Sequence, residues 1–418
     1  MGDKLELDLR RTIVALSDTL DVVDDVNTRH GKRVAYMAVE CGRHLGFDAQ
    51  TLDDIFLFGL LHDIGVSSFS ERLDLLNNKE PRSLSEHCRR GYKLLRHFSP
   101  LRHLAEPILH HHTIWEDFDK LGGATKVAQI ANLIHLVDRV DATIFQSSDD
   151  DISRNRELAL AFLKAQQGAI FQQELVDAFL EVSSSSVFWF RLKQQPLIRF
   201  LEDTIEASEP WLIDIGQIKE LAKMFAQVVD SRSPFAAEHS QGVSQLASYI
   251  GRELALPPLV CEKIEVAGYF HELGKLAEPD EVFGSFSDTD DDQAIDDGYA
   301  TYEILSQIPG MEDVALWAGF SHGVSGQLGQ DFDPEASDCC IPSRILALAE
   351  AFQVLVHPLP KREPMSADMA INILEKMAIS GRLDTDLVEL VKRNPDACLA
   401  AATGFGQPAI AGQNGVAA

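Results

Sequence analysis

Hydrophobic side chains recur every three or four residues along most of the chain. In residues 5–25 this spacing is carried by Leu5, Leu9, Ile13, Leu16, Leu20 and Val23. Such a spacing places the side chains on one face of an α-helix. Segments that alternate hydrophobic and polar residues, as strands do, are nearly absent. The pattern therefore predicts an all-α protein.

The same periodicity continues from His30 and predicts further helices. We expect them over residues 52–61, 85–98, 104–112 and 127–145, with Gly122-Gly123 as a break before the last. The run from Ile55 to Leu61 is apolar on all sides, which predicts a buried helix. This helix leads directly into His62-Asp63-Ile64-Gly65.

Two polar side chains, His62 and Asp63, close this apolar run. Burying them is unfavourable unless their polar groups are satisfied. A metal does so, because an imidazole takes one ion and a carboxylate can bridge two; a buried hydrogen bond between the two side chains is the alternative for an isolated pair. The pair is not isolated, because ten of the 14 histidines lie in residues 1–150.

Five imidazoles and two carboxylates are placed where a fold could gather them: His30, His62, His87, His111, His112, Asp63 and Asp138. This mixture suits a pair of first-row divalent ions such as iron or manganese. In such sites two ions about 3.5–4 Å apart clamp a phosphate and lower the pKa of a bridging water. The sequence therefore favours a dinuclear phosphohydrolase site.

Charge and composition limit the classes of molecule that this protein could bind. The net charge of −28 repels nucleic acid polymers, so we expect no such partner. No apolar stretch approaches the ~20 residues of a membrane helix, so we expect no membrane association. The six cysteines show no paired zinc spacing and are sparse for a secreted scaffold. These features predict a cytoplasmic protein, and a small phosphate ester fits it better than a polymer.

The chain contains an internal repeat with a spacing of about 210 residues. Matching positions share residue types or chemistry: His30 with His239, His62-Asp63 with His271-Glu272, Gly91-Tyr92 with Gly298-Tyr299, His112 with His322, Asp138 with Glu350, and Glu174 with Asp386. We place the join at Ser208-Glu209-Pro210, which breaks the helical pattern. The expected domains are 1–207 and 208–398, followed by an Ala- and Gly-rich disordered tail over 399–418.

The first repeat resembles the HD-GYP branch of the HD phosphohydrolase superfamily. The motifs that carry the resemblance are His30 in its helix, His62-Asp63-Ile64-Gly65, His87 to Gly91, His111 to Trp115 and Leu136 to Ala142. The resemblance covers most of residues 10–185 and recurs, weakened, over 220–395. It implies two tandem HD-type helical bundles and hydrolysis of a cyclic dinucleotide, typically cyclic di-GMP, at a di-iron or di-manganese centre.

The resemblance also implies roles for individual residues. One ion would be held by His30, His62 and Asp138, the other by His87, His111 and His112, with Asp63 bridging them. Asp141 would support a ligand from behind, and Arg139 would contact the substrate phosphate. Relatives that bind a third ion have a Glu where this chain has Val26, so we expect two ions.

The first repeat departs from the family at three places. Val66 replaces the lysine that meets the substrate phosphate, and Thr113 replaces a Glu after the paired histidines. Glu116 to Lys120 stands where the Gly-Tyr-Pro loop is expected. These departures put the rate of catalysis and the preference for cyclic di-GMP in question more than metal binding.

The second repeat lacks more of the ligand set. Glu350 replaces Asp138 and Glu272 replaces Asp63, while Ala294 and Ser321 replace two imidazoles. Lys275 is retained where the first repeat has Val66, and could serve the first site. We expect a degenerate domain with a regulatory or scaffold role.

The function favoured by these observations is a metal-dependent phosphodiesterase that hydrolyses a cyclic dinucleotide with a water activated by two metal ions. One alternative is a catalytically weak or inactive signalling adaptor that binds a nucleotide or a partner protein. Another is an HD hydrolase that acts on other nucleotides. A homodimer, or a complex with a signalling protein, is a further expectation.

Overall fold

The computed structural model describes residues 4–21, 29–67, 71, 81–123, 125–145, 152–231, 238–277, 291–321, 340–358 and 362–404. These residues are helical apart from one two-stranded sheet and the connections between elements, so the all-α prediction is confirmed. Clustering of contacts divides the chain into two compact units. The first comprises Met1–Met224, Leu276–Phe286 and Gln307–Gly310, and the second Phe225–Lys275, Ser287–Ser306 and Met311–Ala418.

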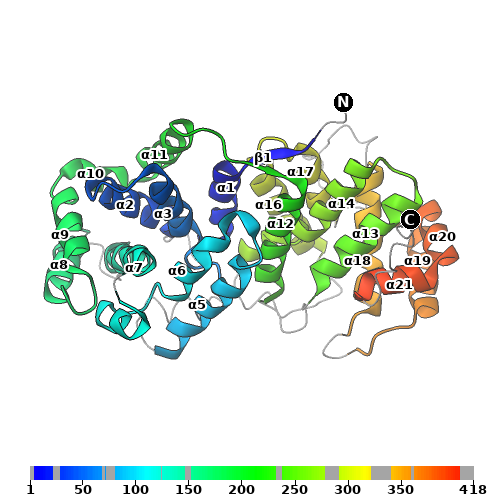
Figure 1. Ribbon diagram of the computed structural model, residues 1–418. Helices are drawn as coiled ribbons and strands as arrows, with labels where there is room; N and C mark the ends of the chain where they lie inside the picture. The colour runs from blue at the N-terminus through cyan, green and yellow to red at the C-terminus, as the bar shows by residue number, and fades with distance from the viewer. Residues whose placement is uncertain are drawn as a thin grey trace, which may run out of the picture. The chain divides into compact units, whose positions relative to one another are not determined.

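The first unit is a helical bundle. Its elements are β1 (Glu6–Asp8), α1 (Leu9–Asp21), α2 (His30–His44), α3 (Ala49–Leu61), α5 (Pro81–Leu95), η1 (Ser99–Leu104), α6 (Ala105–Leu109), η2 (Trp115–Leu121), α7 (Lys126–Phe145), α8 (Ile152–Ala165), α9 (Gln173–Val182), α10 (Ser186–Arg191), α11 (Gln194–Glu206) and β2 (Leu212–Asp214). Helix α7 contacts α2, α3, α6, α8 and α9, and Figure 1 shows it end-on among them. The element that carries Asp138 is therefore central to this unit.

The predicted helices of this unit exist with shifted ends. The buried helix expected over 52–61 is α3, and the helix expected over 127–145 is α7. The helix expected over 104–112 is shorter, because α6 ends at Leu109 and His111 and His112 lie in the turn that follows. That turn allows both imidazoles to face the same side, which consecutive residues of a helix do not.

A short antiparallel sheet ties the segment after α11 to the start of the chain. Strand β1 pairs with β2, with Leu7 opposite Ile213. Arg10 donates hydrogen bonds to Asp53 and to the backbone oxygen of Glu209. Residues 209–214 therefore pack with the first unit, and the division between the compact units falls later than the expected join at 208.

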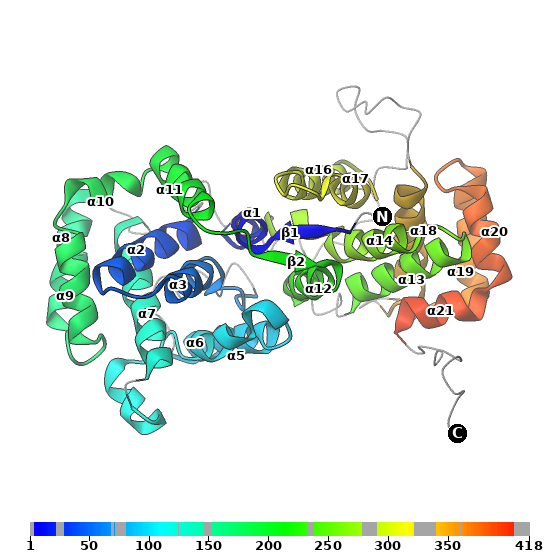
Figure 2. The same ribbon diagram turned by 45° about the horizontal axis from the view of Figure 1, so that its top comes forward.

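The second unit is built from α12 (Ile215–Ser231), which begins in the first unit, α13 (His239–Glu253), α14 (Pro258–Phe270), η3 (Leu273–Ala277), α16 (Asp291–Ser306), α17 (Glu312–Gly319), α18 (Ile341–Val356), α19 (Ala367–Ile379), α20 (Thr385–Arg393) and α21 (Pro395–Thr403). Helix α13 packs on α14, α18 and α21, and Figure 2 shows α13 and α14 side by side. The tail expected over 399–418 was placed too early, because α21 continues to Thr403 and buries Cys398 and Ala402. Residues 405–418 lie outside the described residues.

The repeat seen in the sequence is also a repeat of backbone detail. Helices α2 and α13 both begin after a residue with positive φ, Arg29 at 87° and Glu238 at 70°. A Cβ on Gly65 would collide with the backbone oxygen of His87, and a Cβ on Gly274 with that of Asp297. Only glycine lets α5 and α16 approach the turn that follows the His-Asp or His-Glu pair.

Two residues used in the sequence comparison, Val26 and His322, lie outside the described residues. No helix among the described residues is long and apolar enough to cross a membrane.

Candidate metal centre

Helix α3 presents His62 and Asp63 at its C-terminal end. Asp48 caps the first turn by accepting a hydrogen bond from the backbone N–H of Thr51 at 2.8 Å. The apolar residues of α3 from Ile55 to Leu61 are buried, so packing fixes the position of this helix. His62 is buried, whereas the side chain of Asp63 is 14% exposed. The carboxylate therefore lies at the accessible side of the site.

The first group of potential ligands surrounds His30, the first residue of α2. Its Nε2 lies 3.2 Å from Nε2 of His62 and 3.3 Å from Oδ1 of Asp138. Two ligand atoms that each lie about 2.1 Å from one ion are roughly 3 Å apart when they subtend a right angle. The spacing of these atoms therefore fits a shared first-row ion.

The second group comes from α5 and the turn after α6. Nε2 of His87 lies 3.1 Å from Nε2 of His111. The ring centroid of His112 lies 4.2 Å from that of His111 and 5.1 Å from that of His87. The structure thus brings together the three imidazoles that were expected to hold a second ion.

Asp63 reaches both groups with different oxygens. Oδ2 lies 3.5 Å from Nε2 of His62 and 3.9 Å from Nε2 of His30. Oδ1 lies 3.6 Å from Nε2 of His87. The arrangement is the one that a bridging carboxylate requires, with one oxygen toward each group.

Hydrogen bonds behind the rings orient three of the imidazoles. Nδ1 of His62 lies 2.9 Å from the backbone oxygen of Gly59, and Nδ1 of His111 lies 2.7 Å from that of Ile108. Nδ1 of His30 lies 2.7 Å from Oδ2 of Asp141. When Nδ1 donates its proton in this way, Nε2 presents its lone pair to an ion. The donor set therefore fits the metal pair that the sequence predicts.

The surroundings set the protonation of these rings in the metal-free protein. Burial and the neighbouring imidazoles lower the pKa of His111 and of His112 well below the usual value. Burial alone would also lower the pKa of His30, but Asp138 and Asp141 raise it to about 10. His111 and His112 are therefore neutral at pH 7, whereas an ion would have to displace a proton from His30.

Asp141 is held from two sides. It is fully buried, and its carboxylate accepts hydrogen bonds from Arg33 Nε at 2.6 Å and Nη2 at 2.8 Å while it also contacts His30. Burial would raise the pKa of Asp141, but Arg33 and His30 hold it below the usual range. The buried charge is thus paired, and it fixes His30 from behind, the place expected for Asp141.

The cations near the site are engaged by carboxylates or backbone. Arg139 donates to Oδ2 of Asp138 from Nε at 3.1 Å and from Nη2 at 2.9 Å, and its side chain is only 10% exposed. Arg90 donates to the backbone oxygen of Gly65 at 2.6 Å, beside Val66, and pairs with Glu71. Lys120 pairs with Asp117 on the surface. The contact of Arg139 with a substrate phosphate stays a prediction.

Three residues at the site were not singled out from the sequence. Cys88 places Sγ 3.5 Å from Nδ1 of His111 and 3.7 Å from Nε2 of His87. Arg33 pairs with Asp141. His135 is buried, and its ring centroid lies 5.2 Å from that of His112. Cys88 directly follows His87 in the sequence, and His135 lies one turn before Asp138, but neither position alone shows that the side chain faces the site.

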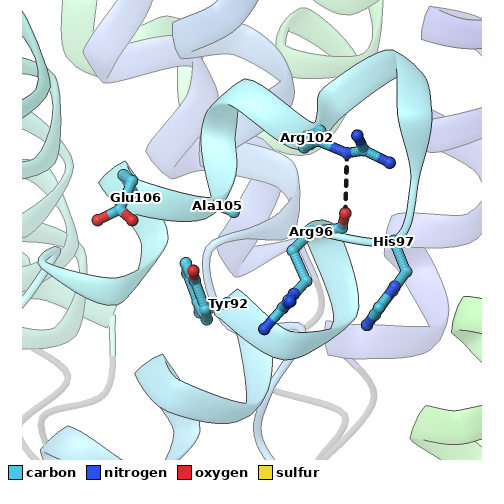
Figure 3. A pocket seen from close by; sticks show the side chains of 6 residues that line it. All are labelled: Tyr92, Arg96, His97, Arg102, Ala105 and Glu106. Atoms are coloured by element: carbon cyan, nitrogen blue, oxygen red, sulfur yellow. Dashed lines mark hydrogen bonds between the residues drawn. The ribbon is translucent and has the colours of Figure 1, made fainter.

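A separate surface pocket of about 440 Å³ contains none of the predicted ligands. Figure 3 shows its lining by Tyr92, Arg96, His97, Arg102, Ala105 and Glu106, with Arg102 donating to the backbone oxygen of Arg96. His97 thus lies at the surface. The candidate site is the pair of histidine groups rather than this pocket.

The second repeat gathers a smaller group. The nitrogen and oxygen atoms of His239, His271, Glu272 and Glu350 lie within 4.8 Å of one another. Lys275 pairs with Glu272 inside this repeat. Ser321, where the first repeat has His111, is buried and donates to the backbone oxygen of Ala318 at 2.9 Å. The second repeat therefore lacks an imidazole ligand at Ser321, as the sequence predicts.

The chain is similar over most of its length to proteins of known activity. The 3'3'-cGAMP-specific phosphodiesterase 1 of Vibrio cholerae is 29% identical over 404 residues, which is 93% of this chain and 92% of that protein. The 3'3'-cGAMP-specific phosphodiesterase 3 of the same organism is 21% identical, with 88% and 90% covered. A crystal structure of a cyclic GMP-AMP specific phosphodiesterase of V. cholerae has a similar fold, with a TM-score of 0.61 at 20% identity, over 96% of this chain and 99% of that chain.

The HD domain family matches this chain twice, over residues 15–169 and 223–387. The two matches coincide with the two repeats and together span well over half of the sequence. The chain therefore belongs to the HD domain family, in a tandem arrangement.

Proposed function

We propose that the first repeat is a metal-dependent phosphodiesterase that hydrolyses a cyclic dinucleotide. The observation that carries the proposal is Asp63, whose two oxygens face the two histidine groups at 3.5 Å and 3.6 Å. Five imidazoles and two carboxylates suit iron or manganese better than magnesium, which prefers oxygen ligands.

Each residue of the site has a part in this reaction. One ion would be held by His30, His62 and Asp138. The other ion would be held by His87, His111 and His112. Asp63 would bind both ions. Two bound ions would supply positive charge to the phosphate and lower the pKa of a water between them. Asp141 and Arg33 keep His30 oriented, and Arg139 fixes one oxygen of Asp138 so that the other faces His30.

The substrate class follows from the relatives. Both V. cholerae proteins are named as 3'3'-cGAMP-specific, and each is matched over about nine tenths of its length. We therefore place 3'3'-cGAMP before cyclic di-GMP as the substrate. The absence of the Gly-Tyr-Pro sequence at 116–120 supports this order, because the first repeat departs there from the branch that typically acts on cyclic di-GMP.

The test is metal analysis of anaerobically purified full chain together with chromatographic assay of 3'3'-cGAMP and cyclic di-GMP hydrolysis. Asp63→Asn should lower the rate by more than about a hundredfold. Mutation of a residue that only orients a ligand already lowers metal affinity or activity about 10–100-fold. Glu272→Gln, the matching change in the second repeat, should leave the rate within about twofold.

One observation favours a second function, that of a signalling adaptor. Val66 cannot supply the cation that the family uses at this position, and Arg139 and Arg90 are held by a carboxylate and by backbone. Full metal occupancy without hydrolysis of either cyclic dinucleotide would support the adaptor and refute the enzyme.

A further inference from the structure

We infer that the second repeat holds one divalent metal ion of its own, between His239, His271 and Glu350. These residues match His30, His62 and Asp138, which form the first group of the first repeat. The ring centroids of His239 and His271 are 5.4 Å apart, compared with 5.0 Å for His30 and His62. The repeat that lost the second group has therefore kept the geometry of the first.

The two imidazoles are oriented as metal ligands. Nδ1 of His239 lies 2.6 Å from Oε1 of Gln353, and Nδ1 of His271 lies 2.8 Å from the backbone oxygen of Gly268. With an ion bound, each ring would donate its Nδ1 proton backwards and present the lone pair of Nε2 to the ion. Oε2 of Glu350 lies 3.1 Å from Nε2 of His239 and 2.9 Å from Nε2 of His271.

An unsatisfied buried atom marks the place of the ion. His239 is only 8% exposed, and its Nε2 has no hydrogen-bond partner. This Nε2 lies 3.1 Å from the carboxylate of Glu350 without a well-aligned hydrogen bond to it. A cation between these atoms would take both as ligands, and the spacings near 3 Å fit one ion with ligands at about 2.1 Å.

The neighbouring groups limit the site to a single ion. Lys275 pairs with Glu272, so the second carboxylate is already neutralised. Ser321 uses its hydroxyl on the backbone oxygen of Ala318, the same bond that Nδ1 of His111 makes to Ile108. A serine at that position offers no imidazole to a second ion.

The ion would link three helices. His239 begins α13, His271 follows α14 and Glu350 lies within α18, so the three ligands come from distant parts of the sequence. A ligand that binds only the folded state stabilises it. We assign this ion a structural role in the second unit, and it adds to the proposed function without being needed for it.

The experiment is elemental analysis of the anaerobically purified full chain by mass spectrometry. Wild type should hold one ion more than Glu350→Gln, and Asp63→Ala, which disrupts the first site, should keep that ion. Glu389→Gln, which removes a carboxylate of the same unit from the exposed Glu389–Lys392 pair, is the matched control and should keep the full count. Cobalt-loaded Asp63→Ala should show ligand-field absorption that Asp63→Ala/Glu350→Gln lacks.

Equal ion counts in wild type and folded Glu350→Gln would overturn the inference. If Glu350→Gln does not fold, Gln353→Leu is tested in its place. This substitution removes only the acceptor behind His239 and should lower the affinity for the ion roughly tenfold or more. Hydrolysis reports separately on the proposed function: an inert wild type with the extra ion refutes the enzyme alone, and an active wild type without it refutes this site alone.

Discussion

Replacing Asp141 by Asn tests whether the hydrogen bond from His30 Nδ1 to Asp141 supports metal binding. The change keeps the shape of the side chain but removes a charge that is fully buried and that binds both Arg33 and His30. The new amide can accept one hydrogen bond through its oxygen, and its NH₂ group would face a donor. Both metal affinity and folding stability should therefore fall.

The two losses have different sizes. Partners that orient a ligating imidazole are worth 10–100-fold in metal affinity, which is about 1.4–2.7 kcal/mol. Removing one partner of a buried ion pair costs about 3–5 kcal/mol, because the guanidinium of Arg33, 6% exposed, loses its carboxylate. Competition with a chelator measures the first quantity and urea unfolding of the metal-free protein measures the second.

A second substitution separates the effects. Arg33→Leu combined with Asp141→Asn removes both charges, so much of the lost stability should return. Metal affinity should recover less, because the carboxylate behind His30 is still missing. If Asp141→Asn alone binds metal as tightly as wild type and unfolds at the same urea concentration, the reasoning about this pair is refuted.

Three further changes have defined outcomes. Val66→Lys should raise cyclic dinucleotide hydrolysis about ten- to a hundredfold at constant metal content, since a charge-assisted contact is worth roughly 1.5–3 kcal/mol; an unchanged steady-state rate would mean that another cation serves. His111→Gln should lose the second of the two first-repeat ions while the first remains, which elemental analysis of the folded variant can check. Burial raises the pKa of Asp230 to about 7, so its charged form destabilises the fold above that pH. Asp230→Asn should therefore raise the unfolding temperature of chelator-treated protein at neutral and higher pH, and the difference should vanish below the unfolded pKa of about 3.9.

The sequence predicted the helices whose patterns are strongest. The apolar run before His62 made α3 predictable, and the long amphipathic pattern around Asp138 made α7 predictable. The end of α6 was predicted wrongly, because His111 and His112 continue the composition of the helix while the backbone turns after Leu109. Periodicity does not report such a local change of backbone direction.

The candidate ligands were predictable because residue type limits metal chemistry strongly. Their supports were not, because Arg33 and Asp141 are 108 residues apart and only the packing of α2 on α7 brings them together. Cys88 was missed for a related reason, since its neighbour His87 says nothing about the rotation of α5.

The two repeats differ in what neutralises the carboxylate that follows the second histidine. In the first repeat, Oδ1 of Asp63 faces His87, and two bound ions would neutralise both of its oxygens. In the second repeat, Ala294 and Ser321 stand in place of two imidazoles, and Lys275 pairs with Glu272 three residues along the chain. Although burial would raise the pKa of Glu272, Lys275 and the nearby histidines lower it to about 2, so the carboxylate stays charged. Lys275 is thus engaged by a carboxylate within the second repeat, and this pairing, rather than contact with a phosphate, is the role that the structure gives it.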